Sequence, residues 1–130
     1  MQLISRADFN RHDLILRGAQ HYLRQFDWVP NGKFWDPDKM TLSIIGAIGL
    51  ALGMKVEGMM DSTLLQPVVN FFCDIRMAEL KDIAKLHYIS VPKYEMQVLK
   101  TKEEAIEVLE KLHAANRTRY EWSLQDNAVG

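Results

Sequence analysis

Apolar residues recur three and four positions apart over two long stretches of the chain, as they do on one face of an α-helix. This spacing predicts a first helix over residues 10–26, with Asn10 as its N-cap. It also predicts a last helix that begins after Thr101, where Thr-Lys-Glu-Glu fits a capping box, and ends near Asn116. Residues 117–130 would follow as a C-terminal tail whose last five residues fray.

Two further helices are expected in the middle of the chain. Residues 42–52 are apolar almost all round, which predicts a helix that is buried on most sides and central to the fold. Its glycines and alanines would let other backbones approach closely. A fourth helix would start at the Thr63 to Gln66 capping box and run to about Lys85, with a break near Met77 as an alternative.

The β signals are short. Asn31-Gly32 lies between aromatic and β-branched residues, which predicts a β-hairpin between the first and second helices. Residues 88–91 and 96–99 are two further β-like runs. The sequence therefore predicts a mainly α fold with a minor β part: about four helices around a buried small-residue helix, in a single helical domain over residues 1–116. The expected core consists of Ile15, Leu23, Phe26, Ile44, Ile45, Ile48, Leu52, Phe72, Ile75, Ile106, Leu109 and Leu112.

Composition and charge exclude several classes of protein. The chain has 130 residues and a mass of 15.0 kDa, enough for one domain. Sixteen Lys and Arg residues against seventeen Asp and Glu give a net charge of −1, which excludes a polybasic nucleic-acid binder. No stretch approaches the roughly 18 apolar residues of a membrane span, and the N-terminus lacks the apolar core of a signal peptide. We therefore expect a cytoplasmic protein that does not bind membranes.

Catalytic and metal-binding motifs are absent from the sequence. The histidines, at positions 12, 21, 87 and 113, have no spacing typical of a metal site, and no glycine-rich phosphate loop is present. Cys73 is the only cysteine and is expected to be a small core residue. The sequence thus favours a non-enzymatic protein without a cofactor or metal. An enzyme or small-ligand protein, with a site built from dispersed histidines and acids, is the third alternative.

Aromatic and methionine residues form the best candidate contact site for a partner. Trp28, Phe34 and Trp35 flank one turn, and Met59 and Met60 belong to a glycine-containing connector. Tryptophan is enriched in interface hot spots, and exposed methionine suits an adaptable contact surface. A small core that pins the loop and a buried gap-filling role are the structural alternatives. These residues predict a protein-binding module whose partner is another protein or complex, and a homodimer is also compatible with the small-residue helix.

A nucleic-acid-associated protein is the second alternative. Arg117, Arg119, Tyr120 and Trp122 place cations and aromatic rings together near the C-terminus. Such a mixture can bind phosphate and stack on a base. A solvated surface, with Tyr120 and Trp122 covering the core, explains the same residues.

Four short motifs follow one another in a fixed order over roughly residues 14–115: Ile15-Leu16-Arg17-Gly18-Ala19, Phe26-Asp27-Trp28, Ser43-Ile44-Ile45-Gly46-Ala47-Ile48 and Thr101-Lys102-Glu103-Glu104-Ala105. In this order they resemble an uncharacterised family of small helical proteins from bacteria, notably actinobacteria, and their phages. The chain departs from that pattern at Ser90-Val91-Pro92-Lys93, where the family tends to have Trp-Asn-Asp. The resemblance implies a fold but no activity. It suggests a phage or mobile-element accessory protein that inhibits or modulates a host protein complex.

Overall fold

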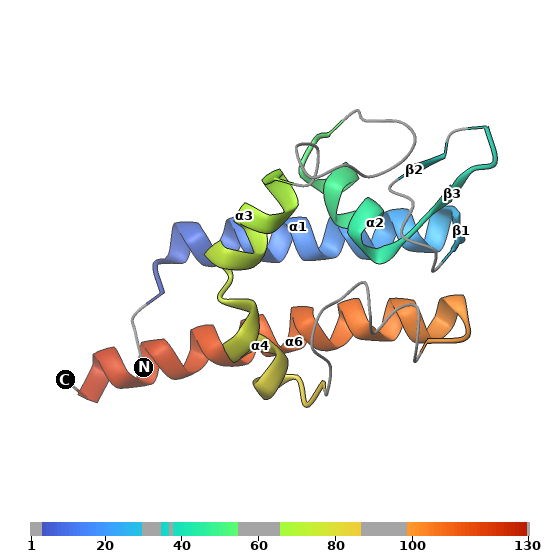
Figure 1. Ribbon diagram of the computed structural model, residues 1–130. Coiled ribbons are helices and arrows are strands. Elements are labelled where there is room, and N and C mark those ends of the chain that lie inside the picture. The colour runs from blue at the N-terminus through green and yellow to red at the C-terminus, as the bar shows by residue number, and fades with distance from the viewer. Residues whose placement is uncertain (1–3, 30–34, 37, 55–65, 87–98, 130) are drawn as a thin grey trace.

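The computed structural model describes residues 4–29, 35–36, 38–54, 66–86 and 99–129 (Figure 1). The described part is mainly helical, as the sequence predicts. Its helices are α1 (Arg6–Gln25), α2 (Ile44–Ala51), α3 (Gln66–Asp74), α4 (Met77–Ile83) and α6 (Lys102–Val129). Its strands are β1 (Asp27–Trp28), β2 (Trp35–Asp36) and β3 (Thr41–Leu42).

The two longest helices, α1 and α6, lie side by side and run in opposite directions (Figure 1). Contacts along their whole length fix this pairing. Lys102 Nζ donates to the carbonyl of Arg24 at 3.0 Å at one end, and the rings of Phe9 and Tyr120 stack with centroids 4.3 Å apart towards the other. Helix α2 packs against α1, and α4 packs against α6. The α1–α6 pair is therefore the frame on which the shorter helices are mounted.

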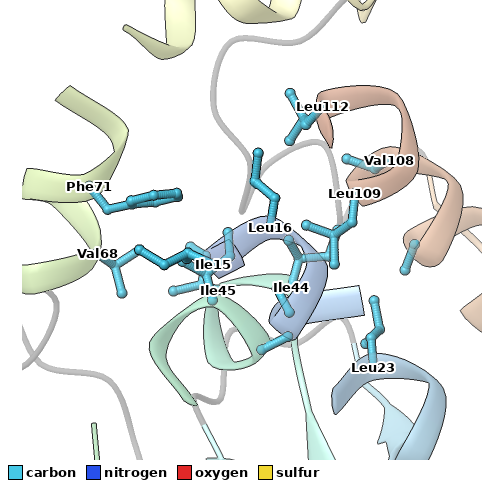
Figure 2. Close-up of a cluster of buried hydrophobic side chains, with 14 of the residues drawn as sticks. Ile15, Leu16, Leu23, Ile44, Ile45, Val68, Phe71, Val108, Leu109 and Leu112 are labelled. Carbon is cyan, nitrogen blue, oxygen red and sulfur yellow. The ribbon is translucent and has the colours of Figure 1, made fainter. Parts of the chain in front are cut away.

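The core fills the space between α1, α2, α3 and α6 (Figure 2). Most of the predicted core residues are buried there, including Ile44 and Leu109. The predicted core residues Phe26, Leu52, Phe72 and Ile106 are only partly buried at the edge of the cluster. The buried core residues that are absent from the predicted set are Ile4, Leu16, Ala19, Leu42, Ala47, Val68, Phe71, Leu80, Leu86, Leu99, Ala105, Val108 and Ala115.

Helix α1 starts earlier than predicted. Ser5, not Asn10, is its N-cap, because the Ser5 hydroxyl accepts a hydrogen bond from the amide of Asp8 at 3.1 Å. Asn10 lies on the exposed side of the helix interior. The extra turn is stabilised by Phe9, whose ring packs on Tyr120 of α6. That contact between distant segments has no signature in the local sequence.

The prediction that α2 is buried is confirmed, since residues 44–49 are all buried, but α2 packs mainly on α1 and is not the centre of the fold. Ser43 caps its N-terminus by accepting from the amide of Gly46 at 3.1 Å, and Gly53 follows its C-terminus with φ of 84°, a conformation that favours glycine. The two helices approach each other closely at Gly18 of α1. A Cβ at that position would lie 3.3 Å from the Cβ of Ala51, so glycine lets α1 and α2 pack closely.

The strands do not form the expected hairpin. β3 lies between the other two, parallel to β1 and antiparallel to β2, so the strands on either side of Asn31-Gly32 are not paired with each other. The prediction of that hairpin is therefore wrong. The antiparallel pair is closed instead by the segment after β2, where a carboxylate oxygen of Asp36 accepts from the amides of Asp38 and Lys39 at 3.0 and 3.2 Å. Asp36 therefore forms a side-chain turn at this point of the chain.

The break near Met77 is confirmed. Arg76 has φ of 50° and separates α3 from α4, which begins at Met77. The Thr63 half of the predicted capping box and the β-like run at 88–91 lie outside the described residues, as does nearly all of the run at 96–99.

The start of α6 is confirmed and its predicted end is wrong. The amide of Glu104 donates to the Thr101 hydroxyl at 3.2 Å, and the Thr101 amide donates to the Glu104 carboxylate at 3.0 Å, which is a complete capping box. The helix then continues past Asn116 to Val129. The inward positions beyond Ala115 are polar yet buried, among them Arg119, so the apolar period ends while the helix does not.

Candidate functional site

Two of the predicted contact residues belong to the small sheet, on the strands that flank β3. Trp28 is half-buried and packs against the core from β1, which supports the structural alternative for this side chain. The backbone of Trp35 lies in β2. Phe34, Met59 and Met60 lie outside the described residues. The prediction that these five residues contact a partner stays a prediction.

The four residues of the nucleic-acid alternative point in different directions on α6. Arg119 is 1% exposed, so its guanidinium is not available to a phosphate. Tyr120 is half-buried against Phe9. Arg117 and Trp122 remain exposed. On α6, Arg119 and Tyr120 therefore face inward, whereas Arg117 and Trp122 face solvent.

A largely apolar open surface lies on α3 and α4. Val69, Phe72, Cys73, Met77 and Ala78, together with the charged Arg76 and Glu79, line an open groove of about 520 Å³, and we call the five uncharged residues the α3–α4 patch. Val69 is 46% exposed, and the Cys73 thiol is also exposed. The prediction that Cys73 is a core residue is therefore wrong.

The local sequence of α3 accounts for this surface. Val68, Phe71 and Ile75 turn inward at helical spacing and are buried. Val69 and Phe72, one position further on, fall on the neighbouring outward side of the same helix. A helix whose apolar arc is wider than the core can cover leaves part of that arc to solvent. The width of the arc is the sequence signal for the patch, whose members Phe72 and Cys73 the sequence predicts in the core.

The charges at the edge of the patch are paired with each other. The Arg11 guanidinium lies 3.1 Å from the Asp74 carboxylate, and Arg76 lies 3.8 Å from Glu79. Each pair brings a cation and an acid together, so the patch carries little net charge. It is suited to an apolar contact rather than to an ionic ligand.

A buried arginine holds the patch on the α1–α6 frame. Arg119 Nη1 donates to the carbonyl of Ile75 at 2.6 Å, at the junction of α3 and α4, and lies 3.6 Å from the Glu79 carboxylate. Its Nη2 donates to the side chain of Asn116 at 3.1 Å. Burial lowers the pKa of the Arg119 guanidinium from its usual value, and Glu79 opposes that shift. The position of the α3–α4 patch thus depends on a polar contact from α6.

His12 lies beside this anchor at the meeting point of α1 and α3. It is buried, and its ring meets that of Phe71 edge to face with centroids 5.9 Å apart. Burial, and then the positive charge of Arg11, lower the pKa of His12 from 6.5. The neutral imidazole is therefore the form that suits this packing.

A contact between the titratable side chains of Asp13 and His113 links the two frame helices. His113 Nε2 lies 2.6 Å from a carboxylate oxygen of Asp13, and Arg17 approaches the second oxygen at 3.9 Å. The role suggested for Asp13 in a first helical turn is thus replaced by a contact between helices. No group of three or more metal-ligating side chains occurs among the described residues, and His87 lies outside them.

Comparisons with models of protein families, with curated proteins and with solved structures find no match to this chain. The resemblance to the bacterial and phage family therefore stays a prediction. Within the described residues, no helix is both long enough and apolar enough to cross a membrane.

Proposed function

We propose that the chain is a non-enzymatic protein-binding module and that the α3–α4 patch contacts the partner. The observation that carries this proposal is the open groove of about 520 Å³, lined mostly by exposed or half-buried apolar side chains, with the paired Arg76 and Glu79 as its charged lining residues. Removing such a surface from water is the usual source of binding energy between proteins. That the partner is a host complex, and that binding inhibits it, are the finer parts of the proposal.

The chemistry of the patch favours an apolar partner segment. The acids and cations around it neutralise one another, so a strongly charged ligand gains little there. An amphipathic helix can lay its apolar face into a groove of this kind. We therefore take the apolar face of a helix from another protein as the occupant.

Cys73 makes the proposal directly testable, because it is the only cysteine in the chain and lies in the patch. A photoreactive maleimide attached there should cross-link the partner in nuclease-treated host lysate. Val69→Lys should remove that cross-link and, with the identified partner purified, should weaken binding about tenfold or more. Val69→Lys keeps Cys73, so the same maleimide probe can be attached to this variant.

Leu14→Lys is the matched control, because Leu14 is also an exposed apolar residue, at 67%, but lies on α1 outside the patch. It should leave both the cross-link and the affinity unchanged. Equal binding by the two lysine variants would overturn the proposal. A cross-link to a second copy of the chain, with a dimer seen by light scattering that Val69→Lys dissociates, would make this patch a homodimer interface instead.

A further inference from the structure

A second groove, on the other side of the α3–α4 unit, differs from the patch in its chemistry. It lies between the end of α4 and the middle of α6 and has a volume of about 360 Å³. Its floor is apolar, with small residues contributed by both helices. The lining consists of Ile83, Ala84, Lys85, Lys111, Ala114, Ala115, Thr118 and Trp122.

An exposed indole forms part of the groove. Trp122 is 42% exposed, and it shares one face of α6 with Thr118, Ala115 and Lys111, which precede it at spacings of three and four residues. Tryptophan is the side chain on which a planar aromatic ligand stacks best while it remains partly wet. The groove therefore offers a stacking surface to a flat ring.

Two lysines supply positive charge to the same groove. Lys85 is exposed, and it forms no ion pair with another residue in the described part of the chain. Lys111 lies 3.1 Å from Glu107, an exposed pair of the kind that contributes little and exchanges readily. A ligand with a planar ring stacked on Trp122 and an anionic group near the two lysines uses both the indole surface and the positive charge.

The groove also has an extension across α6. Ala114 and Thr118, which are small, line a second hollow of about 290 Å³ together with His113, Arg117 and Glu121. Arg117 is exposed, so a third cation lies further along the same surface. A ligand with successive anionic groups could follow this surface past the acidic Glu121.

We propose that the α4–α6 groove binds single-stranded nucleic acid, with one base stacked on Trp122 and the adjoining phosphates near Lys85 and Lys111. Interleaved aromatic rings and cations are the general requirement for such binding. The α3–α4 patch lacks both an unpaired cation and a tryptophan among its lining residues, so the two surfaces suit different ligands. This proposal does not depend on the proposed protein partner.

Lys85 allows a test that separates binding from folding. The backbone of Lys85 is left-handed, with φ of 61°. The Leu86 amide donates to the Lys81 carbonyl at 2.9 Å, so Lys85 occupies the left-handed position of a helix-ending turn, where glycine is favoured. Lys85→Gly therefore removes the ammonium without straining the backbone. We expect an unchanged or higher Tm together with weaker binding of a fluorescein-labelled single-stranded oligonucleotide at low salt, measured by anisotropy.

The salt dependence gives a second readout. For single strands, each phosphate contact contributes about 0.7 to the slope of log affinity against log salt, so Lys85→Gly should reduce that slope by about 0.7. Trp122→Ala should weaken binding at least about fivefold at every salt concentration. Leu124→Ala is the matched control on the same helix, since Leu124 is exposed but does not line the groove.

Unlabelled competitors complete the test. A short single strand that competes at much lower concentration than a free nucleotide supports the proposal. A free nucleotide that competes equally well would reduce the site to a nucleotide pocket and overturn the extended path along α6. No binding by the wild-type chain, or equal affinity of wild type and Trp122→Ala, would overturn the proposal altogether.

Discussion

Arg119 is the largest of the completely buried side chains in the described part of the protein. Its guanidinium bonds to the Ile75 carbonyl and to Asn116, and lies near Glu79, while its Nε has no hydrogen-bond partner among the described residues. A charge in this position stabilises the fold only while its partners remain in place. Removing it leaves the Ile75 carbonyl and the Asn116 side-chain oxygen without this donor, whereas Glu79 keeps Arg76 at 3.8 Å.

Arg119→Met should lower the free energy of unfolding by about 2–3 kcal/mol, because it keeps most of the packing volume but leaves the Ile75 carbonyl and the buried Asn116 side-chain oxygen without their donor. Chemical denaturation measures this change. Arg117→Met, two residues earlier on the exposed side, should change stability by less than about 0.5 kcal/mol. Equal effects of the two substitutions would show that the buried contact contributes nothing specific.

At the scale of single elements, caps fix where the helices begin more firmly than the apolar pattern does. Ser5, Ser43 and Thr101 each accept from a backbone amide at the start of a helix. The Thr101 box is the most complete, because Glu104 bonds back to the Thr101 amide. It opens the helix that packs along the whole of α1, so its loss should affect the entire molecule.

Thr101→Ala should therefore destabilise the protein by about 1 kcal/mol, since it removes the acceptor for the Glu104 amide. Thermal or urea unfolding measures the change. Thr101→Ser keeps the hydroxyl and should restore most of the stability. If the serine variant were as unstable as the alanine variant, the threonine methyl rather than the cap would be responsible.

At the scale of the whole molecule, the α3–α4 unit is held on the frame by its buried apolar side chains, such as Phe71 and Leu80, and by a few polar and aromatic contacts. Arg119 reaches it from α6, and Arg11 pairs with Asp74 at its edge. His12 touches Phe71 of α3 from α1. The charged groups that act on His12 are Arg11 and Arg119, which lower its pKa further, and Asp8 and Asp74, which oppose them.

This arrangement predicts a loss of stability in mild acid. The folded-state pKa of His12 lies below its ordinary value of 6.5, so both states are neutral above that pH and no cost arises there. As the pH falls below 6.5, the unfolded chain takes up the proton first, and the free energy of unfolding decreases until the folded-state pKa is passed.

The free energy of unfolding should accordingly fall more steeply for wild type than for His12→Gln between about pH 7.5 and 5.5, by at most about 1.4 kcal/mol per pH unit. Urea titrations at several pH values measure the difference, and the remaining histidines cancel in the comparison. Parallel curves for the two proteins would contradict the prediction.

Local sequence determined the helical character of the chain, the buried α2, the break at Met77 and the Thr101 cap, because propensity, capping and turn chemistry act over a few residues. It could not determine which side of α3 faces solvent, since Phe71 and Phe72 are equally apolar and only the positions of α1 and α2 decide between them.

Only the tertiary structure decided the length of α6, the order of the strands and which aromatic residues of α6 face inward. It extended α6 beyond Asn116 by burying Arg119, and it placed β3 between β1 and β2 in place of the hairpin at Asn31-Gly32. It also separated the inward Tyr120 from the outward Trp122. In each case the deciding contact joins residues far apart in the chain. No local sequence pattern indicates which distant residue will be the partner.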